Sequence, residues 1–334
     1  MDYRDYVLIL KIQCYFYYIL AVIGIPANLV TIAILCRGKC GLFKALTLHL
    51  LTIALSDLMV IAFSVIFDKI IYFNVSLTFF STPVCNFNQF MKSAFIDCSV
   101  WSTVAFTFDL FMAVCHQGLK AKYCTVRTAA TVLGAIWVVS ILRNIPEYIK
   151  YEPLVTMDYQ IWGCRVKRGF GHLAGWAIFD WLQHILTPLI PYVSILLFNC
   201  LTVKHILAAS SVRKRLRSQT INNGVGQNGN DAEVENRRKS IFLLFTISAS
   251  FILLWMAKVI NFILDRLAKV YYNPADFSHP LAILQQTGTM LMLLTSCVHT
   301  FIYVLTQTKF RREMLTGLTF PFTVIVQMSK LFKR

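Results

Sequence analysis

The stretch CNFNQFMKSAFIDCSVWSTVAFTFD, residues 85–109, decides the fold of this chain. From Cys85 to Asp109 the sequence advances 24 residues, or about 36 Å in an α-helix, slightly more than the ~30 Å core of a bilayer. The stretch therefore predicts a helix that crosses a membrane, with Cys85 at one surface and Asp109 at the other.

The whole chain has the composition of a membrane protein. Of its 334 residues, 57% are hydrophobic and 14% are charged, and its mean hydropathy is +0.61, which a water-soluble domain could hardly carry. Stretches of about 18 to 25 mostly apolar residues predict membrane-spanning helices. We therefore expect an all-α membrane protein, a single domain over 1–334, with seven transmembrane helices near 12–36, 46–70, 86–115, 129–149, 176–206, 240–265 and 281–305.

The net charge of +16 is unevenly distributed, and its distribution indicates an orientation. More than half of the 32 Lys and Arg lie in the segments that follow spans one, three, five and seven. Such a bias marks the cytoplasmic side, so we expect the N-terminus outside the cell and the C-terminus in the cytoplasm. Basic residues placed in this way argue against nucleic acid as a partner.

Two segments outside the spans differ from them in composition: a polar loop and an amphipathic stretch. The polar, Gly/Asn-rich run NNGVGQNGNDAEVENRRK, residues 222–239, predicts a flexible third inner loop over 208–238. After span seven, Phe310, Met314 and Leu318 recur at steps of four with basic residues between them. That spacing predicts a short amphipathic helix over 307–318 on the inner lipid surface.

The ten cysteines are distributed unequally across the expected membrane. Cys85 and Cys164 fall on the oxidising outer side, and we expect a disulfide between them, the other reading being two unrelated thiols. The remaining eight lie in or beside the spans or on the cytosolic side, without the paired spacing of a zinc site. We expect no metal or cofactor.

Several motifs in a fixed order resemble those of a known family. They are GIPANLV with Asn28, LSDLMV with Asp57, FILLW with Trp255 and FIY with Tyr303, together with Trp137, Pro191 and the stretch that ends at Asp109. Over about residues 12–318 the chain resembles the rhodopsin-like (class A) G-protein-coupled receptors. LLTIALSDLMVIAFSVIFDKI, MAVCHQGLKAKYCTV, LLFTISASFILLWMAK and FIYVLTQTKFRREML are most similar to the orphan-type subgroup that includes G-protein coupled receptor 139.

The resemblance implies a function as well as a fold. It implies a multi-pass receptor of the plasma membrane, not an enzyme, which binds an extracellular small molecule or peptide and signals to a heterotrimeric G protein. Members of the subgroup are associated with aromatic amino acids or peptides, and we expect a ligand of this kind.

Polar residues in the outer halves of the spans predict a ligand pocket. Lys92 lies two turns below Cys85, and Lys258 lies one turn outward from Trp255. Two cations would suit a carboxylate, an aromatic amino acid or a peptide terminus; otherwise the lysines extend to the headgroups and touch no ligand. The predicted pocket consists of Asp68, Lys92, Ile96, Trp181, His184, Trp255 and Lys258.

Asp97 is a second acidic residue on span three. It follows Lys92 by five residues, about 140° around a helix, so we expect it to lie off the face that forms the pocket. A charge inside a membrane needs a partner. Arg143 in span four is at a compatible depth, and we predict an ion pair between the two.

Deeper in the bundle, Asp57 is expected to form a polar core with Asn28 and Ser99. The family resemblance implies that such a core often holds sodium. The other reading is a protonated, hydrogen-bonded Asp57 with a packing role only. His299 and Thr300 stand where the family usually has Asn-Pro.

At the inner mouth, Leu110 takes the place of the Arg in the family's Asp-Arg-Tyr motif, and Ala257 replaces a proline of span six. Asp109 then needs another cation, and Arg237 or Arg238 at the inner end of span six is the expected partner. We predict a switch formed by Asp109, Leu110, Arg237, Arg238 and Tyr303, and weak or atypical signalling.

Two other classes of function remain open on the sequence alone. The altered motifs allow a receptor-like decoy or dimer partner that does not signal. A transporter or channel is a weaker alternative, because the chain shows no internal repeat and no pair of broken spans. Asn74 begins the sequon Asn-Val-Ser close to span two.

Overall fold

A computed structural model describes the protein over residues 3–38, 43–71, 81–116, 118, 123–157, 160–167, 169, 173–220, 231–268, 277 and 279–316. Within these ranges, only the backbone is described for residues 3–8, 155–157, 160–162, 209–220, 231–240 and 267–268. The Asn74 sequon and Leu318 lie outside the described residues.

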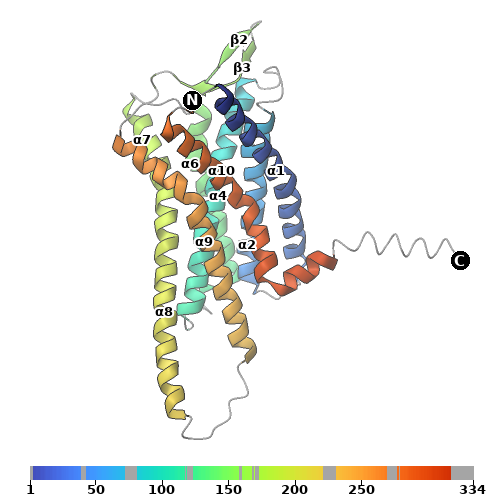
Figure 1. Cartoon of the computed structure of the whole chain (residues 1–334), viewed down its shortest axis with the longest axis vertical. Coiled ribbons are helices and arrows are strands. Elements are labelled where there is room, and N and C mark those ends of the chain that lie inside the picture. Colours follow the sequence, from blue (N-terminus) through green and yellow to red (C-terminus); the bar gives the residue numbers. More distant parts are fainter. Residues whose placement is uncertain are drawn as a thin grey trace, which may run out of the picture.

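The architecture is a bundle of seven long apolar helices, as predicted (Figure 1). Each helix satisfies its backbone hydrogen bonds internally, which a bilayer requires, and its apolar side chains can face lipid. The elements are α1 (Tyr3–Cys36), α2 (Lys44–Val60) continued by η1 (Ile61–Ile71), α4 (Thr82–Cys115), α6 (Val126–Ile149), α7 (Ala174–His184) continued by η4 (Ile185–Leu189) and α8 (Ile190–Thr220), α9 (Asp231–Ala268) and α10 (Pro280–Thr306).

Helix α4 is the central element of the bundle. It contacts α2, α6, α8 and α9, and 67% of its most apolar window is buried, against 22% for α6. A helix covered on most sides places its polar residues against other helices rather than lipid. The charged and hydroxyl side chains of α4 therefore belong to the interior.

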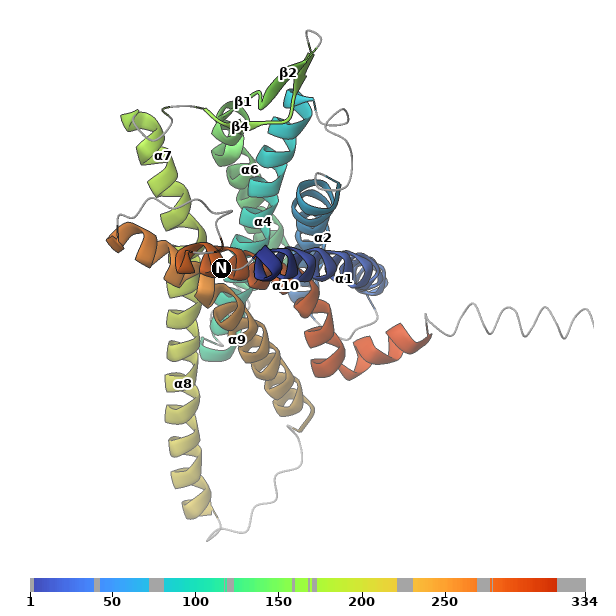
Figure 2. The same cartoon turned by 45° about the horizontal axis from the view of Figure 1, so that its top comes forward.

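The outer end carries two short antiparallel ladders that the sequence did not predict. Strand β1 (Tyr151–Glu152) pairs with β4 (Arg165–Val166), and β2 (Val155–Met157) pairs with β3 (Gln160–Trp162). Figure 2 shows this hairpin over the outer ends of α4 and α6. The predicted disulfide between Cys85 and Cys164 is confirmed, with a Cα–Cα distance of 5.9 Å. It fastens the hairpin to α4.

At the inner end, the helices continue further than the sequence analysis expected. Helix α8 runs to Thr220 and α9 begins at Asp231, so much of the predicted loop 208–238 is helical. Arg, Lys, Glu, Ala and Leu are good helix formers, and they fill these flanks without Pro or Gly. After α10, residues 308–316 form the predicted surface helix, which Figure 1 shows turned away from the bundle.

Candidate functional site

A cavity of about 340 Å³ opens in the outer half of the bundle. Side chains from η1, α4, α6, α7, η4, α9 and α10 line it. Of the seven residues of the predicted pocket, all but Trp181 line this cavity: Asp68, Lys92, Ile96, His184, Trp255 and Lys258.

Trp255 and Lys258 reach the cavity because α9 and α10 approach closely beside them. A Cβ added at Gly288 of α10 would stand 3.1 Å from the backbone nitrogen of Lys258 and 3.2 Å from the carbonyl carbon of Ala257. A side chain at 288 would therefore push the two backbones a few tenths of an ångström apart, and glycine lets the helices meet at this distance. One turn deeper, the Trp255 ring stacks on Phe251, with centroids 5.1 Å apart.

The wall formed by η1 and α4 holds a carboxylate between two lysines. The Asp68 carboxylate lies 3.2 Å from Lys92 Nζ and 3.2 Å from Lys69 Nζ. Gln89 Nε2 also donates to Asp68, at 3.0 Å. Lys92 is thus already paired within the protein, and this wall carries one positive charge in excess.

The opposite wall is built around Asp97, and the predicted ion pair between Asp97 and Arg143 is confirmed. Asn144 Nδ2 also donates to the Asp97 carboxylate, as does Thr187 Oγ1 at 2.7 Å. Gln183 Nε2 extends the network by donating to Asn144 Oδ1 at 2.7 Å. Each Asp97 oxygen accepts at least one hydrogen bond, and Arg143 supplies the charge opposite to that of Asp97, so the network is balanced in charge.

The expectation that Asp97 lies off the cavity was wrong, because Asp97 lines it. The reason is the width of the cavity on α4. Four residues of α4 line it: Lys92, Ser93, Ile96 and Asp97. The cavity therefore covers more of the helix circumference than one row of side chains.

Lys258 differs from the other charged residues of the lining. Its Nζ lies 3.4 Å from Thr289 Oγ1, and Thr289 in turn donates to the Gln285 carbonyl at 2.9 Å. Among the described residues, no carboxylate forms an ion pair with Lys258. A half-buried ammonium without a counter-charge is a binding point for an anion.

Trp181 is the predicted pocket residue that the structure places elsewhere. The Arg266 guanidinium lies over its ring at 4.6 Å and donates to Asp180 Oδ2 at 2.5 Å. A cation–π contact of this kind holds Trp181 at the outer rim between α7 and α9. His184, one turn further along α7, stacks instead on Phe262 at 5.2 Å and reaches the cavity.

The rim above α6 contains a further acidic group. Glu147 lines the cavity and lies 3.3 Å from Lys150 Nζ. Burial, and then the neighbouring Glu147 carboxylate, raise the pKa of the Tyr151 phenol well above its usual value. Tyr151 therefore stays neutral and able to donate a hydrogen bond.

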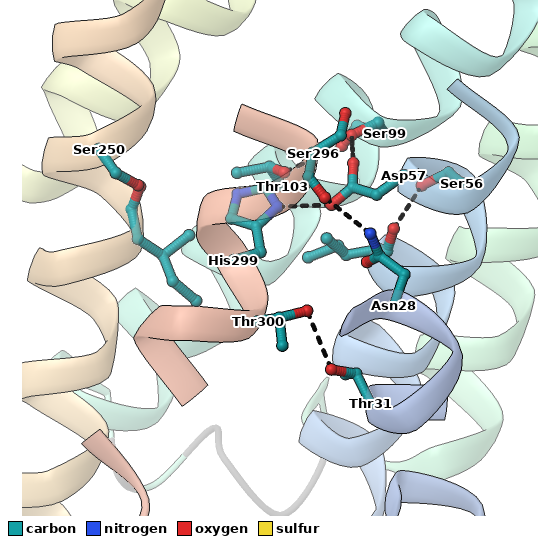
Figure 3. A network of polar contacts seen from close by, with 12 residues as sticks. Asn28, Thr31, Ser56, Asp57, Ser99, Thr103, Ser250, Ser296, His299 and Thr300 are labelled. Carbon is teal, nitrogen blue, oxygen red and sulfur yellow. Dashed lines mark hydrogen bonds and ion pairs between the residues drawn. The ribbon is translucent and has the colours of Figure 1, made fainter. Parts of the chain in front are cut away.

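Below the cavity, the polar core is centred on Asp57, which is fully buried (Figure 3). Ser99 Oγ donates to Asp57 Oδ1 at 2.6 Å, as expected. The second oxygen, Oδ2, lies 2.7 Å from His299 Nδ1. Asn28 was expected to join them but does not bond to Asp57: its Nδ2 donates to the Ser296 carbonyl of α10 at 2.8 Å.

At the inner mouth, the Asp109 carboxylate has a described ion-pair partner in His49, whose Nε2 lies 3.5 Å from Asp109 Oδ2. The predicted contacts to Arg237 or Arg238 concern side chains outside the described residues. Leu110 is fully buried in an apolar cluster with Phe106, Leu243, Leu244, Ile247, Ile302, Tyr303 and Phe310. Helices α4, α9 and α10 therefore meet through apolar side chains where the family has an arginine.

Comparison with known proteins shows the family. The chain matches the profile of the 7 transmembrane receptor (rhodopsin family) over residues 27–303. The chain belongs to this family of receptors. Among its relatives, human C-C chemokine receptor type 8 is 24% identical over 310 residues, which cover 90% of this chain and 76% of that receptor.

Two further relatives of this receptor have similar levels of identity. The FMRFamide receptor of Drosophila melanogaster is 23% identical over 321 residues, 89% of this chain and 52% of that protein. The B2 bradykinin receptor of Cavia porcellus is 23% identical over 319 residues, 92% of this chain and 78% of that protein. The receptor is thus a multi-pass membrane protein whose relatives are receptors rather than enzymes.

Several site residues of this receptor were not found from the sequence. They are His49, Asn144, Gln183 and Thr187, and the pairing of His299 with Asp57. Polar side chains inside spans are the signal that could have drawn attention to them. Among the described residues, no group of three or more His, Cys, Asp or Glu could hold a metal ion.

Proposed function

We propose that this receptor binds a carboxylate-bearing ligand, an aromatic amino acid or a peptide, in the outer cavity and signals to a heterotrimeric G protein. It acts at the plasma membrane with the N-terminus outside and the C-terminus in the cytoplasm. We place it, within this proposal, in the orphan-type subgroup that includes G-protein coupled receptor 139.

The observation that carries the proposal is Lys258, the cation of the cavity that forms no ion pair among the described residues. Asp68 is shared by two lysines, Asp97 is paired with Arg143, and Lys258 has no described counter-charge. Unpaired charge in a partly dry cavity is costly until an opposite charge arrives. A ligand carboxylate that meets Lys258 and Thr289 would supply it.

The size of the cavity limits what can enter. Its volume of about 340 Å³ lies at the low end of small-molecule sites, which run from about 300 to 1,000 Å³. That volume suits one aromatic amino acid or the terminal part of a peptide. The relatives named for FMRFamide and bradykinin point to peptides, and Trp255 and His184 offer aromatic surface for a ligand ring.

Signalling is proposed to be weak, because Leu110 replaces the arginine that the family uses at the inner mouth. Leu110 lies in the apolar core rather than free to turn toward a G protein. Activation must then separate apolar side chains at the inner ends of α4, α9 and α10.

The ligand proposal is tested in cells that carry readouts for each G-protein class, against a panel of aromatic amino acids and peptides. Every active compound is then compared as the free acid and as the C-terminal amide. We expect wild type to favour the acid, and Lys258→Gln to lose that preference. A charge-assisted hydrogen bond of about 1.5 to 3 kcal/mol corresponds to a loss of roughly 10-fold to 150-fold in potency.

Lys92→Gln is the matched control. It makes the same substitution, lysine to glutamine, in the same cavity, but at a lysine that Asp68 already pairs with. At equal surface expression this variant should keep the preference for the acid. If Lys258→Gln discriminates between acid and amide as wild type does, the carboxylate is bound elsewhere and the proposal is wrong.

A further inference from the structure

The polar core brings a histidine to the carboxylate at its centre. His299 Nδ1 lies 2.7 Å from Asp57 Oδ2, and the two side chains are 1% and 0% exposed. Because a carboxylate only accepts, Nδ1 carries the hydrogen of this bond. Figure 3 shows the His299 ring pointing from α10 to Asp57 on α2, with Ser99 of α4 on the other side.

A sodium ion, which the family resemblance implies here, does not fit this arrangement. Hard cations require several oxygen ligands with free lone pairs. Each oxygen of Asp57 already accepts one hydrogen bond, Oδ1 from Ser99 and Oδ2 from His299, so the carboxylate keeps only part of its acceptor capacity for a cation. The Asn28 amide directs its nitrogen to the carbonyls of Gly24 and Ser296 rather than its oxygen to Asp57.

The cavity that adjoins the core at Ser99 and Ser296 is also too small for a hydrated ion. The adjoining cavity has a volume of about 10 Å³ and is lined by Ser99, Thr103, Trp255, Thr295 and Ser296 among others. Neither Asp57 nor His299 contributes to its lining. A space of this size holds at most about one water molecule, and it does not open onto the carboxylate.

We infer that His299, with its own ring N–H, occupies the position at Asp57 that a sodium ion would take, and that this receptor holds no sodium in its polar core. A tethered donor reaches the carboxylate without the cost of capturing an ion from solution. Sodium could enter only by displacing the ring.

Displacement of His299 would leave a buried polar ring without a partner. Its other nitrogen, Nε2, already has no hydrogen-bond partner among the described residues. Loss of the bond to Asp57 would leave both ring nitrogens buried and unsatisfied, which weakens sodium binding by roughly tenfold to a hundredfold. The ring itself therefore disfavours sodium at Asp57.

The consequence for the bundle is a direct link between helices. His299 joins α10 to α2, and Ser99 joins α4 to the same carboxylate. Thr31 and Thr300 add a hydroxyl contact of 3.0 Å between α1 and α10. The helices are thus held by side chains that remain with the protein when the surrounding salt changes.

The test uses the purified full-length receptor in detergent and sodium itself as the probe. The Tm is measured in NaCl and in choline chloride at constant total salt, over increasing sodium. Anything that binds the folded state raises its stability by mass action. We expect the wild-type Tm to be equal in the two salts, and His299→Asn to gain a saturable rise in sodium of about 2 °C or more.

His49→Asn is the matched control, because His49 is another buried histidine 3.5 Å from an aspartate of the same bundle. This variant should stay indifferent to sodium. Adding Asp57→Asn to His299→Asn should abolish the gain, which separates binding at the core from a general salt effect.

Two outcomes overturn the inference. One is a saturable sodium-dependent rise in the wild-type Tm that Asp57→Asn removes, and this measurement decides even where His299→Asn does not fold. The other is a folded His299→Asn variant whose Tm is the same in both salts.

Discussion

Replacement of Asp97 by Asn is the most direct test of the network that forms one wall of the cavity. The Asp97 side chain is 4% exposed, and Arg143 is 18% exposed. Asp97→Asn keeps the shape of the side chain but removes its charge. The substitution also turns one acceptor into a donor, which must face Arg143, Asn144 or Thr187, all of them donors to Asp97 in the wild type.

The magnitude follows from the burial of the partner. Breaking a buried ion pair by removing one member costs about 3 to 5 kcal/mol, since the other charge is left uncompensated. Arg143 keeps some access to the surface, so we take the lower end, about 3 kcal/mol. At about 2 to 4 °C per kcal/mol, the Tm should fall by about 6 to 12 °C.

The assay is the Tm of the purified protein, with surface expression as a second readout. Asp97→Asn combined with Arg143→Gln should lose less than Asp97→Asn alone, because the stranded cation is removed as well. Arg127→Gln is the control, since Arg127 is an exposed arginine near the start of the same helix, α6. It should leave the Tm unchanged.

A Tm of Asp97→Asn within about 1 °C of wild type would refute the reasoning. So would a double variant that is less stable than the single one. Either result would mean that the Asp97–Arg143 pair does not hold α4 against α6.

Two further predictions concern signalling and orientation. Leu110→Arg should increase G-protein activation at matched surface expression, because it restores the family's arginine and removes a fully buried leucine from the apolar cluster; equal signalling by wild type would show that Leu110 is a harmless variation. An epitope tag at residue 1 should be accessible in intact cells and a tag at residue 334 only after permeabilisation, because the basic residues follow the odd-numbered spans. The reverse accessibility would contradict the proposed orientation.

The sequence predicted the features of this receptor that depend on membrane length and compartment. The seven spans follow from hydrophobic length. The bond between Cys85 and Cys164 was predicted because both thiols were expected on the oxidising side, and the structure contains it. Lys258 and Trp255 line the same cavity because they are one helical turn apart. The spans and the Lys258–Trp255 pair could be inferred from the pitch and length of single helices.

Contacts between helices were harder to predict, because they depend on rotation and depth that no single span determines. His299 reaches Asp57 across 242 positions of sequence, and Asp109 has His49 beside it. Trp181 is held at the rim by Arg266, a residue 85 positions away on another helix. The Asp97–Arg143 pair was predicted because a buried charge limits the choice of partner to few residues.

Leu110 also determines how the inner mouth should respond to temperature. The cluster that joins α4, α9 and α10 there is apolar, and hydrophobic attraction weakens on cooling, whereas an ion pair in its place would mainly respond to salt. Opening this mouth exposes hydrocarbon to water and therefore carries a positive heat-capacity change. The apolar contact that Leu110 makes between these helices is thus one that loosens in the cold and is indifferent to ionic strength.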